Sequence, residues 1–287
     1  MKLVIISGRS GSGKSTALQA LEDVGFYCID NLPAKLLPDL ISHMLEDDAQ
    51  LTRIAACIDA RNLSSNLEKL PDIWRQFKQH TQISVELLYL DASHDTLLKR
   101  YSSTRRRHPM AELVNNLPDA IEYERTLLEP IADLADLRID TTLLSIYDLR
   151  DSIKLRVAER SEQSLSLQFE SFGFKHGVPM DVDMVFDMRI LPNPFWIPEL
   201  RKFTGRDQPV IDFLDQEKDV HEMIEDLQKY LSKWLPHFMK NNRSYVTVGI
   251  GCTGGQHRSV YVTEQLASHF KTHMDNVNIR HRELHRT

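Results

Sequence analysis

Cysteine is scarce in this 287-residue chain, and its three copies, Cys28, Cys57 and Cys252, lie far apart. Their spacing predicts neither a disulfide framework nor a zinc site, and it fits a protein of a reducing compartment. Long apolar runs are missing too: none approaches the length that spans a bilayer. The N-terminus leads directly into a strand-like segment, so we expect no signal peptide and a cytoplasmic location.

The chain also lacks an excess of positive charge. Its net charge is −6, which argues against a generally basic nucleic-acid binder. From Leu227 onward, however, nine Lys/Arg stand against three Asp/Glu, and six of the twelve histidines lie there. Such a basic end is a candidate surface for a polyanion, although a solvated basic face is the plainer alternative.

Glycine is absent between Gly25 and Gly173, while seven of the eleven glycines lie in two short stretches, 8–13 and 249–255. Glycine serves where a backbone must adopt unusual dihedral angles or approach a ligand closely. Packing alone hardly explains this concentration, so the distribution singles out two loops as candidate binding sites.

Residues 1–157 alternate between strand and helix patterns. Five short β-rich segments occur at residues 3–8, 26–30, 54–59, 85–91 and 137–140. Helical patterns separate them, for example at residues 14–24, 95–103 and 120–135. This alternation predicts an α/β fold with a parallel sheet that carries helices on both faces.

Residues 158–166 are polar and aperiodic, and they are the predicted linker to a second, smaller α/β domain at residues 167–287. Strand patterns lie at residues 165–174, 184–191, 244–251 and 276–284. Helical patterns lie at residues 220–239 and 258–273.

The first glycine-rich loop fits the pattern G-x-x-x-x-G-K-[ST] in full, and it stands between a predicted strand and a predicted helix. Its residues are Gly8, Arg9, Ser10, Gly11, Ser12, Gly13, Lys14 and Ser15, with Thr16 following. Backbone N–H groups would hold the phosphates of ATP or GTP, Lys14 would reach the β- and γ-phosphates, and Ser15 would bind Mg²⁺. The alternative is a chance match in a Gly/Ser-rich turn.

Asp91, at the end of an apolar strand, is the preferred second acidic group for Mg²⁺, and Asp59 is its rival. Either could simply cap the next helix. A basic stretch follows Asp91, and its arginines would either form a mobile lid, as in small-molecule kinases, or end an exposed helix. They are Arg100, Arg105, Arg106 and Arg107. The segment Asp30–Pro33 lies where such kinases often bind the acceptor.

The second loop, "CTGGQHRS", also lies between a predicted strand and a predicted helix, and three interpretations compete. A cysteine phosphatase would use Cys252 as nucleophile with Arg258 six residues later. An anion-binding site would need only Thr253, Gly254, Gly255 and Arg258 with the helix N-terminus. A structural turn would need neither.

The first loop, together with "FYCIDNLP", "SFGFKHGVP", "LPNPFW", "NNRSY" and "GCTGGQHRSVY", makes the sequence resemble the bacterial RapZ/YvcJ nucleotide-binding family, and its RapZ branch most closely. The resemblance implies a P-loop kinase-like domain that binds ATP or GTP with weak hydrolysis. It also implies a C-terminal domain that binds RNA and glucosamine-6-phosphate. Members of the RapZ branch present a small regulatory RNA to an endoribonuclease, interact with a two-component system, and form tetramers.

The resemblance also implies site residues. The metabolite loop corresponds to Thr253, Gly254, Gly255, His257, Arg258 and Ser259, and the expected RNA contacts are Lys271, Arg280, Arg282 and Arg286. Phe195 stands where the family carries a histidine of the metabolite site, and the C-terminal tail lacks the family's run of lysines.

Three functions therefore remain in competition. The leading hypothesis is a nucleotide- and metabolite-sensing RNase adapter, which is not primarily an enzyme. The first alternative is a P-loop small-molecule kinase, and the second is a phosphatase that uses Cys252.

Overall fold

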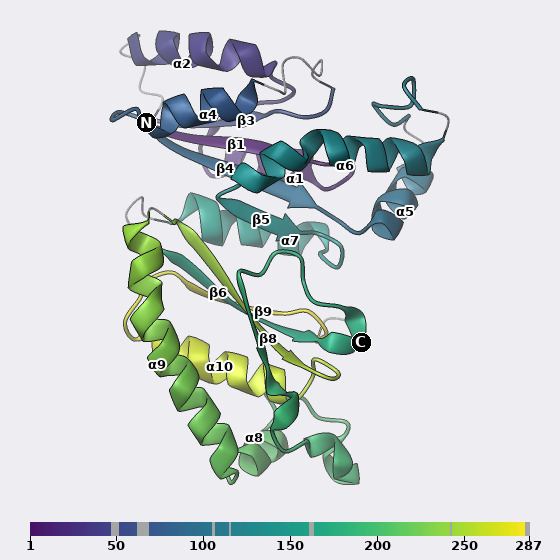
Figure 1. Cartoon of the computed structure of the whole chain (residues 1–287), viewed down its shortest axis with the longest axis vertical. Helices are drawn as coiled ribbons and strands as arrows, with labels where there is room; N and C mark the ends of the chain where they lie inside the picture. The colour runs from purple at the N-terminus through teal and green to yellow at the C-terminus, as the bar shows by residue number, and fades with distance from the viewer. Residues whose placement is uncertain are drawn as a thin grey trace. The chain divides into compact units, whose positions relative to one another are not determined.

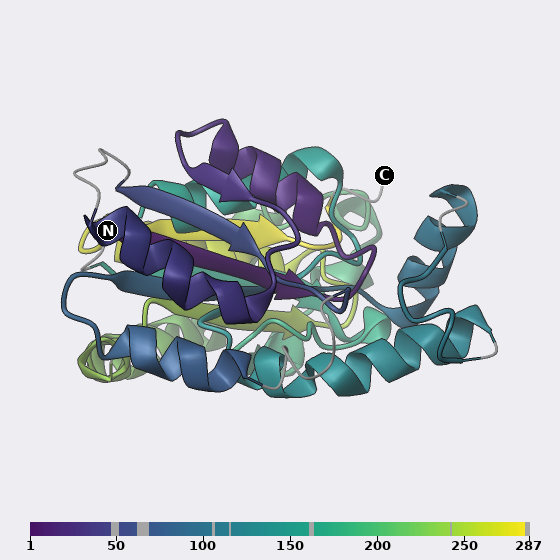
Figure 2. The same cartoon turned by 90° about the horizontal axis from the view of Figure 1, so that it is seen from above.

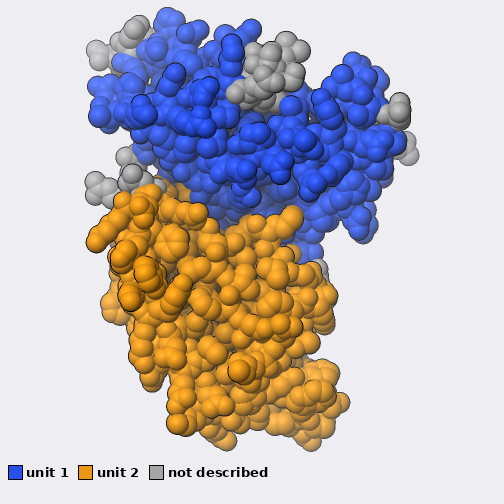
Figure 3. Space-filling view, in the orientation of Figure 1, with its two compact units in different colours: residues 1–159 blue, residues 160–287 orange. Residues whose placement is uncertain are grey.

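The computed structural model describes residues 1–46, 52–61, 69–104, 107–114, 116–160, 164–241 and 243–284. The chain divides into two compact units, Met1–Glu159 and Arg160–Thr287, which Figure 3 distinguishes by colour. Each unit has its own parallel sheet and its own hydrophobic core. No helix among the described ranges is long and apolar enough to cross a membrane.

The first unit is built on a parallel sheet in the order β2-β3-β1-β4-β5. Its strands are β1 (Lys2–Gly8), β2 (Tyr27–Ile29), β3 (Arg53–Cys57), β4 (Ser84–Asp91) and β5 (Leu137–Asp140). Every residue of β1 is buried, as expected for the central strand of a sheet covered on both faces. Figure 2 shows β1 and β3 pointing the same way, so their carboxyl ends meet at one edge.

Helices cover both faces of this sheet (Figure 1). The helices are α1 (Lys14–Glu22), α2 (Leu37–Glu46), α4 (Leu70–Lys78), α5 (His94–Thr104), α6 (Leu117–Leu134) and α7 (Ile146–Ile153), with a 3-10 turn η1 (Ala34–Leu36) and a π-helical turn η2 (Lys154–Ala158). α1 packs on the sheet and on α7, while α4 and α6 pack on the sheet and on each other. The five predicted strands and the α/β class are confirmed.

The second unit contains a parallel sheet in the order β7-β8-β6-β9. Its strands are β6 (Ser166–Gly173), β7 (Met184–Asp187), β8 (Tyr245–Cys252) and β9 (Val277–His281). Its helices are α8 (Gln208–Leu214), α9 (Lys218–Lys240) and α10 (Arg258–Lys271), with 3-10 turns η3 (Phe174–His176), η4 (Met188–Ile190), η5 (Pro194–Trp196) and η6 (Pro198–Leu200). α10 packs against β6, β8 and β9, and α9 packs against α10 (Figure 1).

Two predicted strands of this unit end earlier than the sequence suggested. The segment 184–191 is a strand only as far as Asp187, whose carboxylate accepts a hydrogen bond from Arg189 N and so starts the turn η4. The segment 276–284 is a strand only as far as His281. Because all four strands are parallel, their carboxyl ends meet, and the loops after β6, β7, β8 and β9 lie at one edge.

Candidate functional site

The loop between β1 and α1 has backbone geometry that only glycine adopts easily. Gly8, Gly11 and Gly13 have φ angles of 142°, 85° and 105°. A Cβ atom on Gly8 would lie 2.1 Å from the backbone oxygen of Leu90, and one on Gly13 would lie 2.7 Å from the Leu149 side chain. The glycines are therefore required for the turn itself and for close packing, as a phosphate-binding loop demands.

Polar groups of this loop are buried in a way that suits phosphate. The Lys14 ammonium group is only 7% exposed and donates to the backbone oxygens of Gly8 (2.8 Å) and Arg9 (3.2 Å). Ser12 Oγ is buried and has no hydrogen-bond partner among the described residues. A buried hydroxyl without a partner is costly, so an incoming phosphate oxygen would relieve it.

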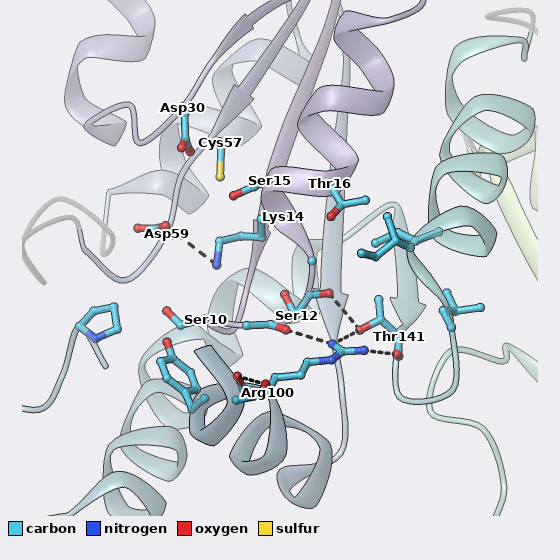
Figure 4. Close-up of a pocket in the computed structure, with 18 of the residues that line it drawn as sticks. Ser10, Ser12, Lys14, Ser15, Thr16, Asp30, Cys57, Asp59, Arg100 and Thr141 are labelled. Atoms are coloured by element: carbon cyan, nitrogen blue, oxygen red, sulfur yellow. Dashed lines mark hydrogen bonds and ion pairs between the residues drawn. The ribbon is translucent and has the colours of Figure 1, made fainter. Parts of the chain in front are cut away.

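A cavity of about 720 Å³ opens over the loop (Figure 4). The predicted nucleotide-binding residues Ser10, Gly11, Ser12, Gly13, Lys14, Ser15 and Thr16 all line it. Residues from the β5–α7 connection and from α7 line it as well: Thr141, Leu144, Ser145, Ile146 and Leu149. Gly8 and Arg9 are buried and lie outside its lining.

Asp59, and not Asp91, lies beside the phosphate-binding lysine, which reverses the order of preference from the sequence. Asp91 is bound by Arg9, whose Nε lies 2.6 Å from Asp91 Oδ1, and it does not line the cavity. Asp59 lines the cavity, and its Oδ2 lies 3.9 Å from Lys14 Nζ. Asp59 and Ser15 are therefore the residues that would hold Mg²⁺ together with phosphate oxygens.

The two carboxylates also differ in their pKa values. Burial alone would raise the pKa of Asp59, but hydrogen bonds from Arg61 and the charge of Lys14 more than offset it, so its pKa lies below the usual range. For Asp91, burial outweighs the bond from Arg9 and raises the pKa. Asp59 is the better anionic group for a cation site.

Arg100 is held by hydrogen bonds to Gly11 and Thr141, a set of contacts that we call the Arg100 clamp, and it does not form a mobile lid. Its Nη1 donates to Gly11 O (3.0 Å) and Thr141 Oγ1 (3.0 Å), and its Nη2 donates to Thr141 O (2.7 Å) (Figure 4). Arg107 lines the cavity and pairs with Glu112 on the surface. Arg105 and Arg106 lie outside the described residues.

A buried network that sequence reasoning missed supports the loop from beneath. Glu124 of α6 accepts hydrogen bonds from Ser10 N (2.9 Å) and Ser10 Oγ (2.7 Å), and His108 Nε2 lies 3.2 Å from the same carboxylate. Glu124 is completely buried. No local pattern marks this residue, because its contact spans 114 positions in the chain.

The second glycine-rich loop lies between β8 and α10, at the carboxyl edge of the second sheet. Gly255 has a φ of 74°, and a Cβ there would lie 2.4 Å from Glu283 Oε2 and 2.6 Å from Gly173 N. Gly255 thus serves internal packing. Gly254 faces open space, where the nearest atom to an added Cβ is Lys175 Nζ at 3.9 Å. Lys175 is exposed and lies in the segment "SFGFKHGVP", where no glycine-rich motif marks it as a binding residue.

Arg258, which the sequence predicts to bind an anion, is buried and hydrogen-bonded to the backbone. It is 4% exposed, and its Nη1 donates to the backbone oxygens of Arg189 and Leu191, both at 2.9 Å. Its Nη2 lies 3.5 Å from Thr253 Oγ1 in the loop, and Thr253 itself is exposed. Arg258 therefore holds the loop in place and offers one donor edge toward an anion.

His257 and Ser259 are buried beneath the same loop. His257 is 7% exposed, its Nε2 has no hydrogen-bond partner among the described residues, and burial lowers its pKa. Ser259 Oγ lies 3.1 Å from Cys252 Sγ, which also accepts a hydrogen bond from Gly255 N (3.2 Å). With 3% exposure, the Cys252 thiol is a packed internal group, and this position does not favour nucleophilic attack.

Two of the arginines predicted to contact RNA, Arg280 and Arg282, are only partly exposed and lie close to acidic side chains of the same unit. Arg280 is 17% exposed and pairs with Glu170 (3.3 Å) and Asp181 (3.2 Å). Arg282 is 7% exposed and lies 3.8 Å from Glu170. Lys271, at the end of α10, is exposed, and Arg286 lies outside the described residues.

Phe195 of η5 is 47% exposed, next to Trp196 at 73%. Its ring stacks under the guanidinium of Arg201, 5.2 Å from the ring centroid. No imidazole therefore occupies this position, and a phosphate bound nearby would gain no charged partner from residue 195.

Comparisons with known proteins match both units. The RapZ-like N-terminal domain family matches residues 1–161, and the RapZ C-terminal domain family matches residues 165–285. A nucleotide-binding protein of Ectopseudomonas mendocina is 55% identical over 285 residues, covering 99% of this chain and all of the relative. A nucleotide-binding protein of Marinobacter nauticus is 56% identical over 286 residues, covering 99% and 97%.

Among solved structures, shikimate kinase from Acinetobacter baumannii in complex with shikimate is 17% identical, with a TM-score of 0.37, over 55% of this chain and 94% of that one. The domain matches, the full-length relatives and the glycine-dependent loop over its cavity agree with one another. The chain therefore belongs to the RapZ-like family of nucleotide-binding proteins.

Proposed function

We propose that this protein is an RNase adapter. Its C-terminal unit would bind a small regulatory RNA and glucosamine-6-phosphate, and it would present the RNA to an endoribonuclease. Its N-terminal unit would bind ATP or GTP with Mg²⁺. It would act in the cytoplasm as a homo-oligomer, as a tetramer, in the control of amino-sugar synthesis, with a two-component system as a further partner.

One observation carries the metabolite part of this proposal. At the β8–α10 loop, the exposed Thr253 and the open face of Gly254 lie beside Lys175, at the N-terminus of a 14-residue helix. Helix N-termini and exposed loop N–H groups favour anions, and a nearby ammonium group adds a charge-assisted partner. This chemistry suits the phosphate of a sugar phosphate.

The RNA part rests on family membership and on the local excess of basic residues after Leu227. Since Arg280 and Arg282 are engaged in internal ion pairs, exposed cations such as Lys271 are the better candidates for phosphate contacts. Contacts of this kind release counterions, so RNA affinity should fall steeply with salt.

The test is filter binding of a labelled pool of bacterial small RNAs to the full chain, at several salt concentrations and with or without glucosamine-6-phosphate. We expect salt-sensitive RNA binding. In Lys175→Gln, we expect that about tenfold more glucosamine-6-phosphate is needed to change RNA binding, because one charge-assisted contact is worth roughly 1.5 kcal/mol. The matched control is Lys218→Gln, at the exposed start of α9, which should leave the affinities for RNA and for glucosamine-6-phosphate unchanged. RNA binding that does not respond to salt, or that is absent, would refute the proposal.

A further inference from the structure

The cavity over the first loop extends beyond the groups that a nucleotide needs. Figure 4 shows Asp30, Cys57 and Asp59 on one side of Lys14, and Thr16, Arg100 and Thr141 on another. The second side continues into the apolar residues Leu144, Ile146 and Leu149, which suit a nucleoside. The first side is polar and acidic. Asp59 on this side would hold Mg²⁺, but nucleotide binding does not explain Asp30 and Arg61, which line the cavity as well.

Three charged residues from the ends of two strands form this acidic side. Asp30 follows β2, and Asp59 and Arg61 follow β3. Arg61 Nη2 lies 2.7 Å from Asp59 Oδ2 and 3.6 Å from Asp30 Oδ1. The side chains of Arg61 and Asp30 are 45% and 49% exposed, whereas that of Asp59 is 3% exposed. Asp59 therefore anchors the group, and the other two present polar atoms to the cavity.

The backbone fixes the position of Asp30. The next residue, Asn31, has a left-handed φ of 52°, a conformation that asparagine tolerates better than most residues. Leu32 N then donates to Cys57 O at 2.9 Å, which ties the turn to β3. Cys57 lines the cavity next to Asp30 (Figure 4).

We infer that this acidic side is an acceptor site, at which the protein transfers the γ-phosphoryl group of a bound nucleoside triphosphate to a hydroxyl group of a small uncharged sugar or polyol. Carboxylates accept hydrogen bonds from neighbouring hydroxyl groups, and Arg61 donates to them. Arg61 and Lys14 both lie beside Asp59, at 2.7 and 3.9 Å, so Asp30 is the carboxylate left to face the acceptor. Its negative charge disfavours an acceptor that is itself an anion. The inference requires nucleotide binding by the first loop and is independent of RNA binding.

The reaction balances with groups that line the cavity. Asp30 takes the proton of the acceptor hydroxyl as its oxygen attacks the γ-phosphorus. The new O–P bond forms while the bond from the γ-phosphorus to the bridging oxygen breaks, and the nucleoside diphosphate leaves with that electron pair. Lys14 offsets the charge on the transferred group. The products are a sugar phosphate, a nucleoside diphosphate and a proton, which Asp30 later releases to solvent.

The test is diphosphate release by the full chain with Mg²⁺ and ATP or GTP, against a panel of neutral aldohexoses, aldopentoses and alditols, with the matching sugar acids alongside. We expect at least one neutral compound to raise release tenfold or more over water, with labelled phosphate recovered on it. Asp30→Asn should lower that acceptor-dependent kcat about 100-fold, a loss typical of a missing general base and larger than any change in nucleotide Kd.

Asp39→Asn, an exposed carboxylate on α2, is the matched control and should behave as wild type. If no neutral compound raises release more than twofold, or if only sugar acids do so, the inference is overturned. An Asp30→Asn variant with full acceptor-dependent activity would overturn the role of that residue. None of these outcomes bears on RNA binding, so failure here is distinct from failure of the adapter proposal.

Discussion

Asp59 lies two residues after β3 and Asp91 ends β4, the two strands that flank β1. From the sequence, Asp91 is the preferred acidic residue of the nucleotide site and Asp59 is its rival. The choice depends on Arg9, whose side chain binds Asp91 and leaves Asp59 to face Lys14. Neither residue's neighbours in sequence reveal this contact, because it joins positions 82 apart. Motif and strand pattern therefore predicted the P-loop, while the partner carboxylate needed the folded side chains.

The buried position of Asp59 predicts a pH-dependent contribution to stability. Because its pKa is lowered from 3.8 in the folded state, ionised Asp59 stabilises the fold above that pH, and the contribution is lost as pH falls below it. We expect Asp59→Asn to lower the free energy of unfolding by roughly 2 kcal/mol at pH 7, since Arg61 loses a charge-assisted partner. Urea titrations at pH 7, 5 and 3.5 measure the difference, which should shrink at the lowest pH.

The control for this variant is Asp72→Asn, which removes an exposed pair with Arg75. That change should cost at most about 0.5 kcal/mol at any of these pH values. A cost for Asp59→Asn that is equally small, or that grows as the pH falls, would contradict the assignment of Asp59 as a buried, ionised partner.

At the scale of elements, strand and helix types followed from periodicity, but side-chain environments depended on strand pairing. β9 pairs with β6 in parallel, and this register sets Arg280 opposite Glu170. The excess of basic residues after Leu227 does not reveal these ion pairs. For that reason Arg280 and Arg282 were both predicted from the sequence as RNA contacts. Likewise, Arg100 lies in a basic run, yet the turn after β5 brings Thr141 to it and makes it a clamp.

The clamp connects α5, the P-loop and the β5–α7 connection, and it predicts a loss of nucleotide affinity without unfolding. Arg100→Lys removes the fork that holds Gly11 and Thr141 together, because an ammonium group cannot span both positions. We expect Kd for a fluorescent ATP or GTP analogue to rise about tenfold, which corresponds to about 1.4 kcal/mol. The variant Lys99→Ala changes an exposed neighbour on the same helix and should leave Kd within twofold; equal effects of both would refute the clamp.

Across the whole molecule, two separate hydrophobic cores and two separate sheets predict two unfolding transitions. The nucleotide site is built entirely from residues of the first unit, so nucleotide should stabilise one transition only. At a nucleotide concentration of 100 times Kd, the gain in the free energy of unfolding is about 2.7 kcal/mol. This gain raises the Tm of a domain of this size by about 5 to 10 °C.

Differential scanning calorimetry with and without Mg²⁺ and ATP or GTP measures both transitions. Lys14→Ala, which removes the phosphate-binding ammonium group, should abolish the shift and leave the second transition unchanged. A single transition that moves as a whole would mean that the two cores unfold together, which would contradict the prediction.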